Sequence, residues 1–156
     1  MKEVSIYTDG ACRGNPGRGG WGAILVYGQF EKELSGGEHE TTNNRMELLA
    51  AIEGLRALKE PCRVTLYADS KYLVDAFNLG WTKTWQEENF RTGKKNEVKN
   101  PDLWQTLLEL VKIHEVTFVW VRGHNGHAYN ERCDILATTF ADSFLQEEED
   151  ASLRSE

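Results

Sequence analysis

Two aspartates stand where predicted β-strands end. Asp9 ends an apolar and β-branched stretch that begins at Val4, and Gly10 follows it. Asp69 ends a second such stretch, which begins at Arg63. If these strands lie side by side and parallel, both carboxylates emerge at the edge where open α/β sheets build their sites. The alternative for Asp69 is that it caps the helix that follows.

Two further acidic residues lie near the starts of predicted helices. Glu47 follows Asn44 by three positions, and with Asn44 as the N-cap it would close a capping box. A glutamate in the first helical turn is also held stiffly and points back toward the loop, so both roles stay open. Asp134 is expected in the first turn of the last helix, where it would complement the helix dipole or join the other carboxylates.

Four carboxylates brought together would define the chemistry of the site. They repel one another unless they are protonated or neutralised by cations. Ligand sets made of oxygen alone favour hard cations such as Mg²⁺ or Mn²⁺. A pair of Mg²⁺ ions can activate a water molecule and stabilise the leaving oxygen of a phosphodiester. The candidate ligands of two such ions are Asp9, Glu47, Asp69 and Asp134.

A histidine lies in a glycine-flanked loop before the last predicted helix. His124 stands between Gly123 and Asn125, and a loop histidine can move protons near neutral pH. The alternative is an exposed histidine without a role. A zinc site of His124, His127 and Cys133 is disfavoured, because the thiolate pairs that mark structural zinc are missing.

Neutral polar residues gather in two loops. Asn15 belongs to the first loop, and Thr42, Asn43 and Asn44 belong to the second. Their donors and acceptors suit sugar hydroxyls and phosphates without adding charge. Caps and turns are the equally ordinary alternative.

The segment from residue 81 to residue 100 mixes aromatic and basic side chains. Its five basic and three acidic residues give it a net charge of +2 in an otherwise acidic chain. Aromatic residues interleaved with cations suit a nucleic-acid backbone. The alternative is an amphipathic helix that docks its two tryptophans onto the core. The residues concerned are Trp81, Lys83, Trp85, Phe90, Arg91, Lys94, Lys95 and Lys99.

The elements that must position these residues follow from apolar periodicity and turn residues. Strands are expected over residues 4–9, 21–27, 30–35, 63–69 and 116–121. Helices are expected over residues 44–60, 70–77, 101–114 and 130–144. An antiparallel meander followed by strand–helix units predicts an α/β fold, with a mixed sheet and helices on its faces.

Length and charge limit the possible architectures and partners. The 156 residues suit one compact domain. The net charge of −7 taken alone argues against a nucleic-acid partner. However, the last ten residues contribute −4, and two divalent ions would cancel the four site carboxylates. We expect a catalytic domain over residues 1–146 and a disordered acidic tail over residues 147–156, because such sequence buries little apolar surface.

Cysteine number and the N-terminus bear on the compartment. The odd number of cysteines, without a Cys-x-x-Cys pair, indicates reduced thiols. No apolar run has the length of a membrane span, and the N-terminus lacks the apolar stretch of a signal peptide. We therefore expect a cytoplasmic protein without a membrane partner. We also expect it to be a monomer.

With these residues in view, the sequence resembles the bacterial type 1 ribonucleases H. The resemblance spans about residues 4–145 in family order. It rests on Tyr7-Thr8-Asp9-Gly10-Ala11-Cys12, Gly14-Asn15-Pro16-Gly17, the run from Thr41 to Leu48, Asp69-Ser70-Lys71-Tyr72, Val98-Lys99-Asn100, Asp102-Leu103-Trp104, and Gly123-His124 with the run from Asn130 to Asp134.

The resemblance implies a ribonuclease H-like fold, a five-stranded mixed sheet with helices on both faces. It implies an endonuclease that hydrolyses the RNA strand of RNA–DNA hybrids and leaves 3′-hydroxyl and 5′-phosphate ends. The four carboxylates would hold two Mg²⁺ ions, with Mn²⁺ as a possible substitute, and His124 would assist proton transfer or product release. Asn15, Asn43 and Asn44 would contact the minor groove, Thr42 and Asn100 would bind a DNA phosphate, and Trp81 and Trp85 would line the DNA strand. Cys12 is a further expected substrate-binding residue.

Two departures from the relatives bear on substrate binding. The 81–100 segment corresponds to their protruding handle and is called the handle below. Where many relatives have a basic run, this chain has Gln86-Glu87-Glu88-Asn89, so binding would shift toward Arg91, Lys94 and Lys95. Lys99 is a further expected substrate-binding residue. Lys71 replaces a common glutamine and would add a phosphate contact.

Three other functions compete with this one. A hybrid-binding module without activity would be expected to lack a metal carboxylate, and all four are present. An integrase-like strand transferase would need extra DNA-binding domains, for which this chain has no room. A reverse-transcriptase domain is a third alternative, against which chain length and Met1 favour a free-standing enzyme.

Overall fold

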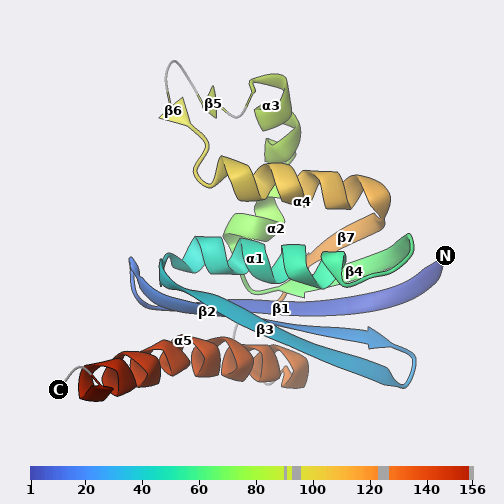
Figure 1. The fold of residues 1–156 in the computed structure, drawn as a ribbon. Helices are drawn as coiled ribbons and strands as arrows, with labels where there is room; N and C mark the ends of the chain where they lie inside the picture. Colours follow the sequence, from blue (N-terminus) through green and yellow to red (C-terminus); the bar gives the residue numbers. More distant parts are fainter. Residues whose placement is uncertain (90, 93–95, 123–126, 155–156) are drawn as a thin grey trace.

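A five-stranded mixed sheet forms the centre of the molecule (Figure 1). The computed structural model describes residues 1–89, 91–92, 96–122 and 127–154. Within these residues the strands of the larger sheet follow the order β3-β2-β1-β4-β7. Strand β1 is antiparallel to β2 and parallel to β4, and β4 is parallel to β7. The strand bounds are β1 Lys2–Gly14, β2 Gly17–Tyr27, β3 Phe30–Thr41, β4 Cys62–Ala68 and β7 Glu115–Trp120.

Apolar side chains on alternate strand positions build the core against helix α1 (Asn43–Arg56). On β4 the buried residues alternate with more exposed ones, which is the period of a strand with one face on a core. Ile6 of β1 and Leu66 of β4 are fully buried, as are Leu48 and Leu55 of α1. This packing fixes α1 across the sheet, and with it the residues at the start of the helix.

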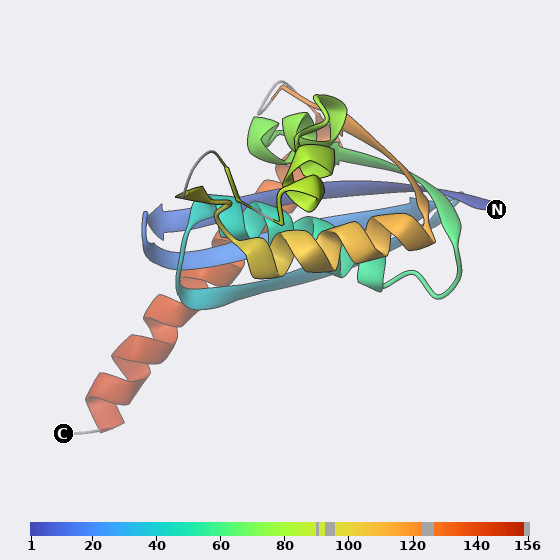
Figure 2. The same ribbon diagram turned by 90° about the horizontal axis from the view of Figure 1, so that it is seen from above.

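Helices cover both faces of the sheet, as predicted (Figures 1 and 2). Helix α5 (Ala128–Arg154) lies on one face and α1 on the other, and both contact β1 and β2. The backbone of α5 comes very close to β2. A Cβ atom at Gly20 would lie 2.0 Å from the carbonyl oxygen of Ala137, and one at Gly22 would lie 2.6 Å from that of Cys133. Glycine at these positions therefore lets the last helix settle on the sheet.

The acidic tail is helical where the sequence predicted disorder. Helix α5 continues to Arg154, and Figure 2 shows its C-terminal end protruding beyond the sheet. Gln146 donates to Asp150 one turn later at 3.2 Å, and Arg18 of β2 pairs with Glu148 at 3.5 Å. Glutamate, alanine and leucine are good helix formers, so the helix extends although it buries little surface. Within the described residues the structure therefore gives the tail as a continuation of α5.

The handle protrudes on the same side of the sheet as α1 (Figure 1). Trp85 packs edge-on against the fully buried Trp104, with ring centroids 4.9 Å apart. The Trp104 indole nitrogen donates to the Tyr72 hydroxyl at 2.9 Å. The elements here are α2 Lys71–Asn78, α3 Trp81–Glu87, β5 Arg91–Thr92, β6 Asn96–Glu97 and α4 Pro101–Ile113.

No helix in the described part of the chain combines the length and the apolar character needed to cross a membrane.

Candidate metal and nucleic-acid site

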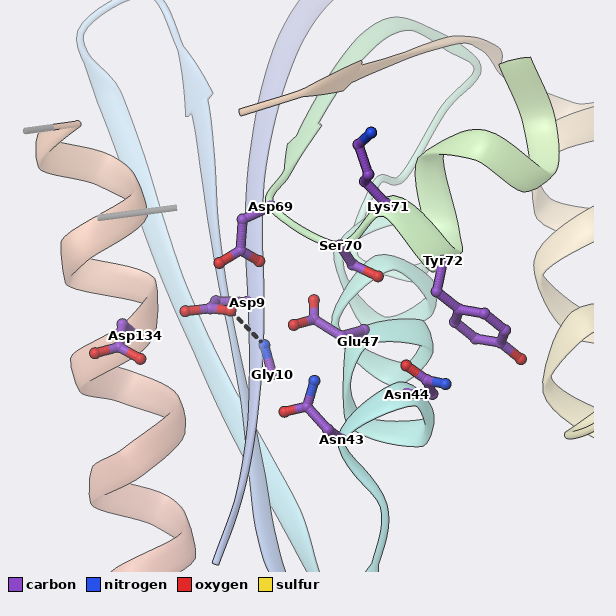
Figure 3. A pocket seen from close by; sticks show the side chains of 10 residues that line it. All are labelled: Asp9, Gly10, Asn43, Asn44, Glu47, Asp69, Ser70, Lys71, Tyr72 and Asp134. Carbon is purple, nitrogen blue, oxygen red and sulfur yellow. Dashed lines mark hydrogen bonds between the residues drawn. The ribbon is translucent and has the colours of Figure 1, made fainter. Parts of the chain in front are cut away.

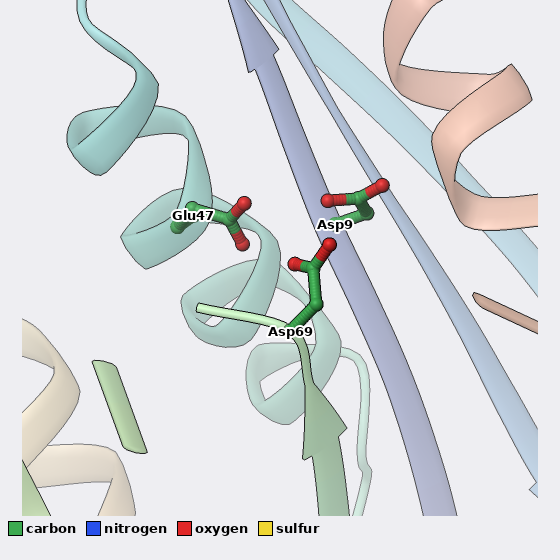
Figure 4. Close-up of side chains that lie close together, drawn as sticks. All are labelled: Asp9, Glu47 and Asp69. Atoms are coloured by element: carbon green, nitrogen blue, oxygen red, sulfur yellow. The ribbon is translucent and has the colours of Figure 1, made fainter. Parts of the chain in front are cut away.

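The parallel pairing of β1 and β4 brings Asp9 and Asp69 together. Thr8 pairs with Ala68, Asp9 is the next residue of β1, and Asp69 is the first residue after β4. The prediction that the first strand ends at Asp9 is wrong, because pairing with β2 extends β1 to Gly14. Figure 4 shows Asp9 and Asp69 directed toward Glu47, and one carboxylate oxygen from each of the three lies within 4.8 Å of the others. The N-cap of α2 is Ser70, whose hydroxyl accepts from the Leu73 amide at 3.2 Å. Asp69 therefore does not cap this helix.

Glu47 is buried and does not close the expected capping box. The N-cap of α1 is Thr42, whose hydroxyl accepts from the Arg45 amide at 3.2 Å, so Glu47 lies in the second turn. Its side chain points into the site, and only 3% of the residue is exposed. Gly10 permits this approach, because a Cβ atom there would lie 2.6 Å from the Glu47 amide nitrogen. Strand β1 and helix α1 therefore meet where both carry a carboxylate.

The electrostatics of this cluster favour a bound cation. Burial, and then the charges of Asp69 and Asp134, raise the pKa of Asp9 to about 8. Burial, and then Asp9 and Asp69, raise the pKa of Glu47 well above its usual value. The Gly10 amide donates to Asp9 at 2.9 Å and offsets only part of this effect (Figure 3).

A second observation supports a cation at the same place. The Glu47 Oε2 atom is buried and has no hydrogen-bond partner. Among the described residues, Asp9, Glu47 and Asp69 form the group whose side chains are arranged to hold a metal ion. An unpartnered oxygen in a set of oxygen ligands fits a hard divalent cation.

Asp134 reaches the same pocket from the opposite face of the sheet. It is the seventh residue of α5 and lies in the second turn rather than the first, which weakens the helix-dipole alternative. It is half-buried and lies outside the group of three. The pocket has a volume of about 380 Å³ and is lined by Asp9, Gly10, Asn43, Asn44, Glu47, Asp69, Ser70, Lys71, Tyr72 and Asp134 (Figure 3).

Comparison with known proteins identifies the family of this chain. A sequence model of the family described as RNase H matches residues 1–142. The chain is 62% identical over 136 residues to ribonuclease H of Chlorobium limicola, covering 87% of this chain and 93% of that protein. It is 59% identical over 138 residues to ribonuclease H of Acetivibrio thermocellus, and the match covers 88% of this chain and 94% of that protein. The chain belongs to the ribonuclease H family.

Solved structures place the fold in the same family. The crystal structure of LC9-RNase H1, a type 1 RNase H with the type 2 active-site motif, has a TM-score of 0.82 at 34% identity and covers 92% of this chain and 74% of that one. LC11-RNase H1, solved in complex with an RNA/DNA hybrid, has a TM-score of 0.62 at 24% identity and covers 91% of this chain and 99% of that one. The expected ribonuclease H-like fold is thus confirmed, and the chain is a nuclease of a metal-dependent family.

The structure brings the predicted polar residues to the rim of the carboxylate pocket. Asn43 and Asn44 are exposed and line it. The Asn15 side-chain oxygen accepts from the Asn43 amide at 3.3 Å, which ties the turn between β1 and β2 to the start of α1. Thr42 caps that helix. The Asn15 side chain, the Thr42 hydroxyl and the Asn43 backbone amide thus already have structural roles. The side-chain amides of Asn43 and Asn44 still line the pocket.

The two cysteines of interest have structural contacts. The Cys12 thiol donates to the Thr41 carbonyl at 3.3 Å and to the Gly17 carbonyl at 3.6 Å. Cys133 is buried and donates to the Tyr7 carbonyl at 3.3 Å, and burial raises the pKa of its thiol. Because the Cys133 thiol is buried and donates to a carbonyl of β1, its contacts give the zinc alternative no support.

The tryptophans of the handle differ in exposure. Trp85 is anchored on Trp104, whereas Trp81 is 42% exposed at the start of α3. Lys99 is exposed, and Asn100 adopts a left-handed conformation before α4 without capping it through its side chain. The core-docking alternative therefore explains Trp85 and leaves Trp81 available. His124, Lys94 and Lys95 lie outside the described residues.

Sequence reasoning missed two residues beside the site. The Trp120 indole nitrogen donates to the Asp69 carbonyl oxygen at 3.1 Å. Arg45 pairs with Glu38 of β3 at 3.0 Å and with Asp102 of α4 at 3.1 Å. Arg45 thereby joins the start of α1 to the start of α4. Both residues lie inside ordinary strand and helix patterns, so nothing local distinguished them.

Proposed function

We propose that this protein hydrolyses the RNA strand of RNA–DNA hybrids and leaves 3′-hydroxyl and 5′-phosphate ends. The observation that carries the proposal is the buried carboxylate group beside a rim of asparagine amides. Family membership supports the reaction, and the rim supports the choice of strand.

Asp9, Glu47, Asp69 and Asp134 would hold two Mg²⁺ ions, with Mn²⁺ as a substitute. The unpartnered oxygen of Glu47 and the oxygen-only ligand set support these ions. When bound, such ions supply the positive charge that makes water a nucleophile near neutral pH and stabilises the leaving oxygen of a phosphodiester. The four carboxylates come from β1, α1, the end of β4 and α5, so the folded core holds them in place.

The rim residues would select the RNA strand. An RNA 2′-hydroxyl both donates and accepts hydrogen bonds, and an asparagine amide can do the same. Asn43 and Asn44 face the pocket, and Asn15 is tied to their backbone at the helix start. Cys12 would contribute to the same substrate contact, because its thiol donates to the carbonyl of Thr41, directly before the N-cap of α1.

The remaining contacts would hold the two strands. Thr42 and Asn100 would bind a phosphate of the DNA strand, and Trp81 would lie along that strand with Lys99. Trp85 would position α3 through its packing on Trp104. Lys94 and Lys95 stay predictions from the sequence.

His124 would move a proton during turnover or help to release the product. In the sequence it stands four residues before Ala128, the first residue of α5, which carries Asp134. This role stays a prediction, as do the monomeric state and the cytoplasmic location.

The proposal is tested by incubating the protein with end-labelled RNA–DNA hybrid, duplex DNA and duplex RNA, each with Mg²⁺ and with EDTA. We expect cleavage of the hybrid alone, only with Mg²⁺, and only in its RNA strand. Product ends are read by their ability to accept a labelled phosphate or to be ligated. If the protein binds the hybrid but does not cleave it in Mg²⁺, it is a hybrid-binding module without activity. Cleavage in EDTA would refute the metal mechanism.

A further inference from the structure

An exposed tryptophan is held rigidly beside the carboxylates. Trp120 is the last residue of β7 and pairs in register with Ala68, one residue before Asp69. Its indole nitrogen donates to the Asp69 carbonyl oxygen at 3.1 Å, yet 41% of the residue is exposed. The ring is therefore fixed at the surface next to the site instead of being buried in the core.

A lysine lies over this ring. The Lys71 Nζ atom is 4.8 Å from the centroid of the Trp120 ring, within the range of a cation–π contact. Lys71 is the first residue of α2, directly after the Ser70 cap. Among the described residues that line the carboxylate pocket, it is the only cation. Figure 3 shows its side chain extending away from Glu47.

The direction of this side chain has a consequence for the site. A lysine two residues from Asp69 would ordinarily be attracted to the carboxylates, where its charge would compete with bound cations. Stacking on Trp120 keeps the ammonium outside that group. A cation over a ring face keeps N–H donors free, and a compact ammonium is well suited to a phosphate oxygen.

We propose that Trp120 is a positioning residue that holds the Lys71 ammonium at the rim of the pocket, where it binds a backbone phosphate of the nucleic-acid substrate beside the phosphate that is cleaved. The proposal rests on the proposed function and adds to it a phosphate subsite built from the Lys71–Trp120 pair. The subsite takes any phosphodiester backbone, so it contributes affinity and register without reading the base.

The first test is the salt dependence of hybrid binding in EDTA, measured with a fluorescent hybrid. Losing one phosphate contact lowers the slope of log K against log salt by roughly 0.7 to 0.9. Between 50 and 200 mM salt, the Kd of the unmodified protein should therefore weaken about threefold more than that of Lys71→Met. Trp120→Leu removes no charge, yet it should lower the slope as Lys71→Met does, and the double variant should lower it no further.

Matched variants separate the contact from a general loss of charge. Lys71→Arg and Trp120→Phe keep a cation and a ring, and both should keep the slope of the unmodified protein. Lys59→Met removes an exposed lysine beyond the far end of α1 and should also leave the slope unchanged. In the unmodified protein, the Lys71 methylene protons next to Nζ should show upfield NMR shifts caused by the Trp120 ring current.

The roles of Lys71 and Trp120 can be refuted separately. An unchanged slope in Lys71→Met, or unshifted Lys71 protons in the unmodified protein, would overturn the proposal. A lowered slope in Lys71→Met together with an unchanged slope in folded Trp120→Leu would leave Lys71 as a contact and overturn the role of Trp120. If Trp120→Leu does not fold, the NMR shifts decide that role. An unmodified protein that fails to bind hybrid would instead reject the proposed function.

Discussion

Replacing Asp9 by asparagine should stabilise the metal-free protein near neutral pH while abolishing its activity. Asp9 is only 3% exposed, and its carboxyl pKa is raised to about 8 by burial and by Asp69 and Asp134. The folded state therefore binds this proton more tightly than the unfolded state does. The free energy of unfolding consequently falls as pH rises from about 4 to about 8. An asparagine cannot ionise, and its side-chain oxygen can still accept from the Gly10 amide.

The size of the effect follows from the pKa shift of Asp9. One pKa unit corresponds to about 1.4 kcal/mol, so the higher pKa of Asp9 in the folded state lowers the free energy of unfolding by about 4 kcal/mol at pH 7, relative to acid pH where the carboxyl is protonated in both states. At pH 5 the same relation gives about 2 kcal/mol, and near pH 3 almost nothing. At pH 7 the variant should therefore melt about 10 °C higher than the unmodified protein in EDTA.

Urea unfolding followed by circular dichroism, at several pH values and with EDTA throughout, measures this difference. Asp142→Asn is the matched control, because contact with Arg13 lowers the pKa of Asp142, so its loss should destabilise the protein at neutral pH. Added Mg²⁺ should narrow the gap between Asp9→Asn and the unmodified protein, since the ion stabilises the carboxylate form. If the difference in the free energy of unfolding between Asp9→Asn and the unmodified protein is equal at pH 5 and pH 7, or absent at both, the site is not a set of repelling carboxylates.

Four further results are expected. Asp69→Asn should nearly abolish hybrid cleavage in Mg²⁺ while its circular dichroism spectrum stays unchanged; retained activity with a lower melting temperature would make Asp69 structural. His124→Ala should slow turnover and leave hybrid binding intact, which single-turnover kinetics across pH would test, and an unchanged rate would remove it from the mechanism. Lys94→Ala with Lys95→Ala should raise KM and flatten the salt dependence of hybrid binding, with kcat nearly constant. Trp85→Ala should cost about 3 kcal/mol in urea unfolding, because the ring packs on the core; a loss below about 1 kcal/mol would contradict that anchoring role.

Most of the fold was predictable because its signals are local. Alternating apolar residues predicted β1 and β4, and helical spacing predicted α1, since each element faces the core with its own period. Asp9, Asp69 and the polar residues around Asn43 were visible for the same reason. The boundaries were less accurate: β3 continues to Thr41, the N-cap of α1 is Thr42, and α5 runs to Arg154. Contacts with β2 contribute to two of these differences, because Thr41 pairs with Gly17 and Glu148 forms an ion pair with Arg18.

The sequence alone therefore determined which side chains could do chemistry and which elements carry them. Only the tertiary structure decided their distances, because these depend on contacts between residues far apart in the chain. Glycine at position 10 lets α1 approach β1, which buries Glu47 beside Asp9 and raises both pKa values. The pairing of β4 with β7 sets Trp120 beside Asp69, and no local pattern specifies that contact. Residue types fix what a site can bind, and strand register and helix packing fix whether the groups meet.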